Sequence, residues 1–208
     1  MMREAIKNML IMQSRMNEKV NECWLEQEFE WYRAVWIECA ELMDQLGYKW
    51  WKKQTVDSQQ VRLEVVDIWH FGMSALLANG GNLIDLAAAI ERDFERNSPK
   101  KINDILIATE AVALDALKTK SFSIRLFAQM MDACELSFDG LYRHYVGKNT
   151  LNLLRQDHGY QDGSYIKQWD GREDNEHLAE LMFDLDAATA DFPDQMYAAL
   201  LKRYEETT

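Results

Sequence analysis

Two pairs of acidic residues have the spacing and the surroundings of a metal site. Glu38 and Glu41 share one face of a predicted helix, because residues three apart in a helix lie about one turn from each other. The same face carries the apolar residues Val35 and Leu42. An unpaired charge among apolar side chains is costly. A single pair of this kind is more often a solvated helix face, so the first pair decides little by itself.

The second pair, Glu64 and Asp67, repeats the pattern on the next predicted helix, in "VRLEVVDIWHFGMSALL". Four carboxylates that face one another would repel strongly unless a cation lies between them. Oxygen ligands without cysteine or histidine suit Mg²⁺, with Mn²⁺ as a substitute, better than zinc. His70 points away from this acidic face on an ideal helical wheel, which predicts a packed core histidine. The two pairs together predict a magnesium site.

A polar and basic stripe has the character of a phosphate-binding surface. Lys148, Asn152 and Arg155 are spaced i, i+4 and i+7 on one predicted helix, and Tyr160 follows just past its end. Mg²⁺ on a few carboxylates usually takes further ligands from substrate phosphates. A basic stripe alone is more often solvated. In a chain with a formal charge of −12, next to a predicted magnesium site, phosphate binding is the better interpretation.

Two primary amides lie inside an apolar arc near the N-terminus. Gln13 and Asn17 are spaced i and i+4 among residues such as Ile6 and Leu10. Buried amides need hydrogen-bond partners, and these two could satisfy each other or a neighbouring backbone group. A carboxamide also presents a donor and an acceptor in one plane, which complements the edge of a pyrimidine such as uracil. Both interpretations stay open.

Helices must position all of these residues. Apolar residues recur with a period near 3.6 over most of the chain, strand-like alternation is hard to find, and no linker divides the sequence. The pattern predicts an all-α, single-domain multi-helix bundle over residues 1–208, with a buried central helix that carries the second acidic pair. The expected helices cover residues 2–22, 26–46, 58–78, 82–95, 101–118, 122–135, 138–156, 176–189 and 193–206.

Composition disfavours several classes of partner. The 208 residues include 23 basic and 35 acidic side chains, which disfavours nucleic acid and anionic membranes as partners. No apolar run has membrane-spanning length, and the N-terminus lacks a signal-peptide cleavage site. The three cysteines form no pair at zinc-ligand spacing. A reduced, cytoplasmic protein is the expectation.

The sequence resembles the dimeric, all-α dUTPases, within the superfamily of all-α nucleoside triphosphate pyrophosphatases that includes the MazG-like enzymes. The resemblance extends from about residue 6 to residue 180. The acidic motifs "ECAEL" and "EVVDIWHF" are shared across the superfamily. The other parts of the match are the amide motif "MQSRMN" and the block "YVGKNTLNLLRQDHGYQDGSY", followed by "WDGREDNE". This block is much more specific than the acidic motifs and points to the dUTPase branch.

The resemblance implies a role for each of these positions. It implies an all-α homodimer that hydrolyses dUTP, and dUDP as a further substrate, to dUMP with two or more Mg²⁺ ions per site. Glu38 or Glu41 is then the catalytic base, without a choice between the two. The implied metal ligands are Glu38, Glu41, Glu64 and Asp67; the phosphate-binding residues are Lys148, Asn152, Arg155, Tyr160 and Lys167; the residues around the base and sugar are Gln13, Asn17, Phe71 and Trp51.

Two other functions compete with this interpretation. The nearest is a sister pyrophosphatase for dCTP, or for both dCTP and dUTP, because an amide can flip to suit either base. The other is a non-catalytic acidic helical interaction protein in which the carboxylates hold a structural cation; the basic stripe speaks against it.

Two further segments carry expectations of a different kind. Residues 158–174 contain three glycines and no helical period, and we expect them to order over the bound nucleotide. The alternative is an ordinary surface loop packed down by its aromatic residues. Residues 79–101 match no motif, and the sequence leaves open whether they form a dimer contact or a mobile element.

Overall fold

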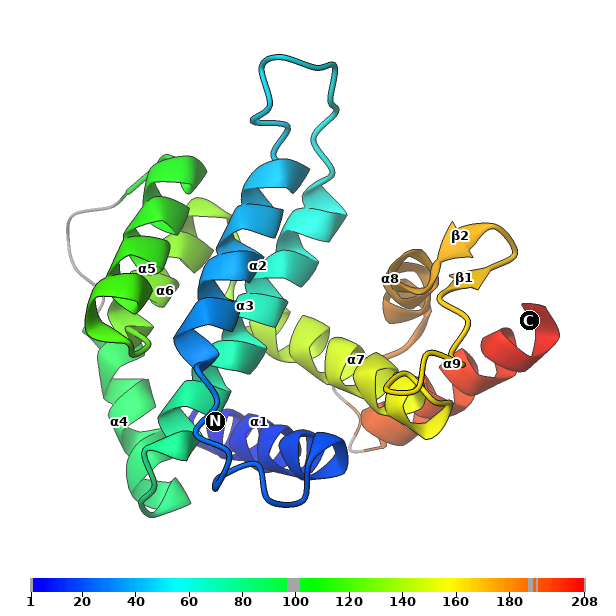
Figure 1. Cartoon of the computed structure of the whole chain (residues 1–208), viewed down its shortest axis with the longest axis horizontal. Coiled ribbons are helices and arrows are strands. Elements are labelled where there is room, and N and C mark those ends of the chain that lie inside the picture. The colour runs from blue at the N-terminus through cyan, green and yellow to red at the C-terminus, as the bar shows by residue number, and fades with distance from the viewer. Residues whose placement is uncertain (1, 97–101, 187–188, 190, 208) are drawn as a thin grey trace.

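The computed structural model describes residues 2–96, 102–186, 189 and 191–207. Within these residues the chain is helical apart from turns and one short strand pair (Figure 1). The predicted all-α class is confirmed. The helices are α1 Met2–Val20, α2 Trp31–Gln45, α3 Ser58–Ala78, α4 Leu83–Glu95, α5 Ile105–Thr119, α6 Ile124–Ala133, α7 Phe138–Asp157, α8 Asp174–Asp184 and α9 Phe192–Thr207, and the strands are β1 Gln168–Trp169 and β2 Arg172–Glu173.

The central element is α3, as its apolar circumference predicts. It pairs with α2 and also contacts α1 and α7 (Figure 1). The start of α3 is fixed by Asp57, whose carboxylate accepts from the backbone N–H groups of Gln59 and Gln60. Trp69 on α3 is fully buried and packs against the rings of Phe94, Phe122 and Phe127. This aromatic packing fixes the position of α3 in the core and therefore the position of its acidic residues.

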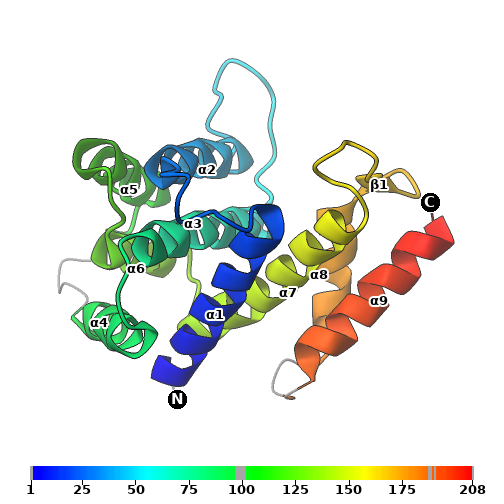
Figure 2. The ribbon, with the colours of Figure 1, turned by 60° about the horizontal axis from the view of Figure 1, so that its bottom comes forward.

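The other helices form two groups, one on each side of α3. On one side α5 packs on α2 and α6, while α4 packs on α1 and α6. On the other side α7 passes between α1 and α9, and α8 packs against both α7 and α9 (Figure 2). The segment 79–101, to which the sequence assigned no role, contains α4; its residues 97–101 lie outside the described part. The single-domain prediction stays a prediction.

The structure differs from the predicted elements in several places. The second helix begins at Trp31 rather than residue 26, because the backbone of Glu28 is left-handed, with a φ of 50°, and a right-handed helix cannot continue through it. The eighth helix ends at Asp184 rather than residue 189. Strands β1 and β2 were not predicted. They pair around Asp170 and Gly171, which both have positive φ, as the two central residues of a tight hairpin turn require.

Candidate active site

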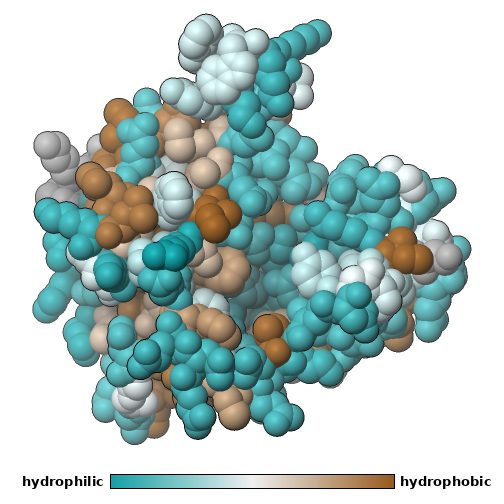
Figure 3. Space-filling view, in the orientation of Figure 1, coloured by the Kyte–Doolittle hydropathy of each residue, from teal (hydrophilic) through white to brown (hydrophobic). Residues whose placement is uncertain are grey.

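Two pockets that share a rim form the candidate site, between α1, α2, α3 and α7. The first, here called the amide pocket, has a volume of about 320 Å³ and contains Gln13 and Asn17. The second, here called the acidic pocket, has a volume of about 600 Å³ and contains the glutamates of α2 and α3. Figure 3 shows a hollow lined by hydrophilic side chains between the two halves of the molecule. The residues that line both pockets are Glu38, Asp67, Lys148, Arg155 and Tyr160.

The structure brings the predicted site residues together. Twelve of the thirteen positions implied by the resemblance line one or both pockets, although the outermost two, Gln13 and Lys167, are 154 residues apart in the sequence. The exception is Trp51, which is 60% exposed in the loop between α2 and α3 and lines a different hollow on α2. The wall of the amide pocket is instead formed by Trp24, Phe29, Trp31 and Phe71, with the last two rings stacked at a centroid distance of 6.3 Å.

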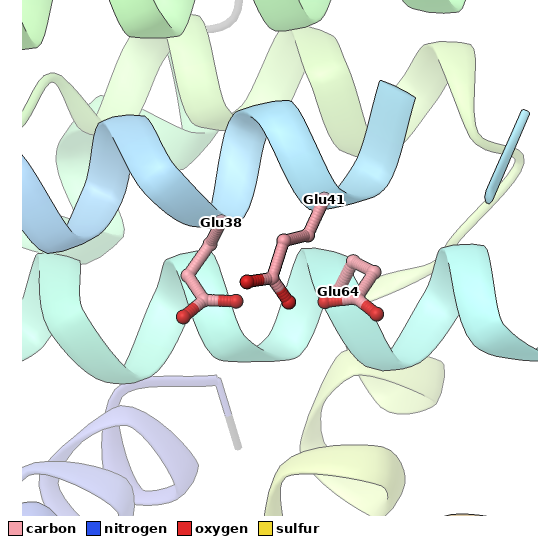
Figure 4. A group of neighbouring side chains, drawn as sticks. All are labelled: Glu38, Glu41 and Glu64. Carbon is pink, nitrogen blue, oxygen red and sulfur yellow. The ribbon is translucent and has the colours of Figure 1, made fainter. Parts of the chain in front are cut away.

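Three carboxylates meet in the acidic pocket. Ligand atoms of Glu38, Glu41 and Glu64 all lie within 4.8 Å of one another, and Figure 4 shows the side chains of α2 and α3 converging. Burial, reinforced by the charges of Asp67, Glu41 and Glu64, raises the pKa of Glu38 to about 8. Burial and the charge of Asp67 raise the pKa of Glu64 to about 7. Such repulsion is what a hard divalent cation with oxygen ligands would relieve, so the donor set fits Mg²⁺.

Asp67 lies beside these three glutamates and forms an ion pair with Lys148. Its Oδ2 is 2.8 Å from Nζ of Lys148, which also donates to Oδ1 of Asn175 at 3.0 Å. Lys148 is buried, so its charge acts in a setting where solvent screening is weak. The ion pair between Asp67 and Lys148 therefore connects the acidic motif of α3 directly to the basic stripe of α7.

Arg155 is held in place by a fully buried carboxylate. Its Nε and Nη2 atoms each donate to Asp174 at 2.8 Å in a bidentate pair, and Nη1 donates to Asn152 at 3.0 Å. Tyr165 also donates to Asp174, at 2.9 Å. Burial opposes ionisation of Asp174, but the hydrogen bonds and charge of Arg155 hold its pKa below the usual range. Held in this way, Arg155 lines both pockets at the rim that they share.

The two other predicted phosphate contacts lie at the edge of the acidic pocket. Tyr160 is half exposed, and the guanidinium of Arg155 lies over its ring at 5.7 Å. Lys167 is exposed and pairs with Glu173 at 3.0 Å.

The amides of Gln13 and Asn17 form part of a buried network. Gln13 Nε2 donates to Asn17 Oδ1 and to Ser74 Oγ, both at 3.0 Å, and Asn17 Nδ2 donates to Ser74 Oγ at 3.0 Å. His70 Nδ1 lies 2.6 Å from Gln13 Oε1. The two amides do satisfy each other, as the simpler interpretation expected, and they also line the pocket. His70 is a packed histidine as predicted, yet it lines the amide pocket too.

Sequence reasoning missed several residues of the site. Asp174 and Asn175 fall in the quoted motif "WDGREDNE", but nothing in their spacing reveals that they hold Arg155 and Lys148. Ser74 is one helical turn after His70 and donates to its carbonyl oxygen. A serine in a helix often donates to the carbonyl four residues earlier, so this bond could have been expected from the sequence.

The second half of the segment 158–174 is packed against the rest of the protein. Tyr165 is largely buried and stacks on Tyr204 of α9 at a centroid distance of 5.3 Å, and Trp169 is fully buried. This matches the alternative of a packed loop for its second half. Gln161, Asp162 and Gly163 are exposed.

Comparison with known proteins agrees with this geometry. A family model described as dUTPase matches residues 5–160, which is 156 of the 208 residues and includes twelve of the thirteen predicted positions, all except Lys167. No curated protein matched the sequence. In the described part of the chain, none of the helices combines the length and the apolar character needed to cross a membrane.

Proposed function

This chain belongs to the dUTPase family, and from that premise we propose that it hydrolyses dUTP to dUMP and pyrophosphate with Mg²⁺. The family makes it a nucleotide pyrophosphatase of the dUTPase type; dUTP itself and the metal are what we propose. The observation that carries the proposal is the joined pair of pockets. One offers planar amides and aromatic rings, the other three converging carboxylates, and Lys148 and Arg155 stand between them.

The chain's own residues would divide the reaction between the two pockets. The aromatic wall would hold the base and sugar, with Phe71 beside the sugar where a 2′-hydroxyl would not fit. Glu38, Glu41, Glu64 and Asp67 would hold Mg²⁺, which when bound neutralises phosphate charge and acidifies water. Glu38 or Glu41 would take the proton of the attacking water. Lys148 and Arg155 would stabilise the charge that develops on the leaving phosphates, with Asn152, Tyr160 and Lys167 at the edges.

The test is a substrate panel. Pyrophosphate release is measured for dUTP, dCTP, dTTP and dATP, and inorganic phosphate for dUDP, each with Mg²⁺, with Mn²⁺ and with a chelator. We expect turnover of dUTP with either metal ion and none with the chelator. Faster turnover of dCTP would make the sister specificity correct. Absence of turnover for the whole panel would favour a protein that acts only through protein contacts.

We propose a homodimer as the working unit. Helices α2 and α5 pack against each other, and both leave large apolar side chains exposed over the face where Figure 3 shows hydrophobic residues. On α5, Ile107, Leu114 and Leu117 are between 44% and 67% exposed and recur at i, i+7 and i+10, hence on one side of the helix. On α2, Trp36 and Ile37 are about half exposed. Such a surface is typical of a subunit interface.

A charge on this surface should break the dimer. Leu114→Glu is expected to convert a dimer into a monomer in sedimentation velocity at micromolar concentration, with an unchanged helical circular dichroism spectrum, because an unpaired charge is costly inside an apolar interface. The control is Phe183→Glu, a similarly exposed apolar position on α8, which should leave the mass unchanged. A wild-type monomer with full activity would contradict the proposal.

Residues 159–164, which precede the buried Tyr165 and Trp169, should become ordered when nucleotide binds. We expect hydrogen exchange to slow in residues 159–164 when Mg²⁺ and a non-hydrolysable dUTP analogue are added, because Tyr160 lines the acidic pocket and closure excludes bulk water. Residues 165–174 should be protected in both states, since Tyr165 and Trp169 are already buried. Equal exchange of 159–164 with and without ligand would show a preformed loop.

A further inference from the structure

A third pocket lies between the first turns of α3, the first turns of α7 and the second half of α8. It has a volume of about 220 Å³, and among the described residues it shares none of its lining side chains with the amide pocket or the acidic pocket. The chain contains 35 acidic residues, yet none of the described ones lines this third pocket. Because two arginines line it, it is here called the arginine pocket.

The two arginines, Arg62 of α3 and Arg143 of α7, are partly buried and have no acidic partner within the described residues. The arginines that form ion pairs in this part of the chain are Arg3, Arg33, Arg155, Arg172 and Arg203. Two positive charges in a partly buried setting repel each other, because water screens them incompletely. An anion between them would relieve this repulsion, and each guanidinium offers a planar fork of N–H donors that suits an oxyanion.

His144 adds a third polar group to the pocket, and a hydrogen bond fixes its tautomer. Its Nδ1 lies 2.7 Å from the carbonyl oxygen of Gly140 on the same helix, and a carbonyl oxygen only accepts, so Nδ1 carries a hydrogen. Burial and the nearby charges of Arg62 and Arg143 lower the pKa of His144, although the bond to Gly140 opposes this, so near neutral pH the ring has no second hydrogen. Its Nε2 therefore has a lone pair, to which none of the described residues donates.

The rest of the lining is apolar and comes mainly from α8. Leu63 and Met182 are buried, and Phe183 lines the same pocket with 75% of its surface exposed. An organic group that covered the ring of Phe183 would remove apolar surface from water. The pocket is smaller than the roughly 300–1,000 Å³ that is typical of sites for drug-sized ligands, so only a small organic group fits beside an anionic one.

We propose that the arginine pocket binds a phosphate monoester of a small organic molecule, with the phosphate group between Arg62 and Arg143 and the organic group against Phe183. This inference goes beyond the proposed function and does not depend on it. A phosphate group with three terminal oxygens can accept from both guanidiniums at once. Its second ionisation has a pKa of about 6, so near neutral pH it can also share a hydrogen with Nε2 of His144, whereas a carboxylate, with a pKa of about 4, brings no hydrogen.

Nitrogen NMR tests the site directly. The probe is phenyl phosphate, added to metal-free protein that is labelled with ¹⁵N-histidine, and the His144 signals are assigned by their loss in His144→Gln. At saturation we expect the Nε2 signal of His144 to move toward the range of a protonated imidazole nitrogen, because the anion supplies or attracts a hydrogen there. The signals of His158, which lines none of the three pockets, should not move. An Nε2 signal of His144 that does not change at millimolar phenyl phosphate would overturn the proposal.

Three substitutions test which groups hold the ligand. Arg62→Gln and Arg143→Gln should each weaken the binding of phenyl phosphate about tenfold or more, since hydrogen bonds between charged groups are lost. Phe183→Ala should weaken the binding of phenyl phosphate and leave that of inorganic phosphate unchanged, because only the phenyl ring contacts this side chain. The matched control is Arg15→Gln, which removes the same charge from an exposed position on α1 and should leave the affinity unchanged. An equal loss of affinity in the control would mean nonspecific attraction between charges and would refute the site.

Two further ligands separate the contributions of the phosphate group and the ring. Benzoate keeps the ring but has a carboxylate, and ribose 5-phosphate keeps the phosphate group but has a polar organic group. Both should bind more weakly than phenyl phosphate. Benzoate with equal affinity would refute a phosphate site, and ribose 5-phosphate with equal affinity would refute the contact with Phe183. Protein that binds phenyl phosphate in this way but fails to hydrolyse dUTP would refute the proposed function and leave the arginine pocket as proposed.

Discussion

Glu38→Gln and Asp67→Asn should each abolish most pyrophosphate release while the helical fold survives. Each change removes one proposed metal ligand with little change in volume. The loss should exceed the roughly 10–100-fold that removal of an outer partner of a metal ligand typically costs. Steady-state turnover is measured at saturating Mg²⁺, with Glu205→Gln as the control because Glu205 is exposed on α9 away from both pockets. A folded Glu38→Gln, Asp67→Asn double variant with retained turnover would exclude the carboxylates from catalysis.

Stability should change in the opposite direction to activity. The pKa of Glu38 is raised to about 8, from an ordinary value of 4.5. A carboxyl with a raised folded-state pKa costs no stability below the unfolded pKa, and an increasing amount as pH rises toward the folded pKa. In metal-free protein, Glu38→Gln should therefore raise the thermal midpoint at pH 8 and have little effect near pH 4.5. A lower midpoint at pH 8 would show that the Glu38 carboxylate stabilises the metal-free fold.

Asp174→Asn should destabilise the protein by about 3–5 kcal/mol, because it leaves the charge of Arg155 buried without its partner. Asp174 has 0% exposure and accepts both arms of the guanidinium. Urea denaturation followed by circular dichroism gives the free energy of unfolding. Activity should fall as well, mainly through a higher KM, since the proposed phosphate contact of Arg155 depends on its orientation.

An exposed ion pair provides the matched control for this change. Glu180 also accepts from arginines, Arg172 and Arg203, but on the solvent-exposed side of α8. Glu180→Gln should leave the unfolding free energy unchanged within error, because water solvates the arginines that lose their partner. Equal effects of the two substitutions would mean that burial is not what makes the Asp174 pair important.

The sequence by itself determined the class of the fold and most of the residues that line the candidate site. The 3.6-residue period predicted α3 with its observed bounds, because a helix must direct its apolar side chains to the core. The same period revealed Glu38, Glu41, Glu64 and Asp67, since a charge inside an apolar arc is visible without knowledge of the neighbouring helix.

Only the tertiary structure decided which residues act on which. Asp174 lies 19 residues from Arg155, and Ser74 lies 61 residues from Gln13, so neither contact follows from spacing within one helix. The choice of Trp31 over Trp51 as a pocket wall follows from the path of the loops on either side of α2. Helical periodicity fixes the direction of a side chain about its own axis. Packing and loop paths decide what that side chain meets, and those depend on the whole chain at once.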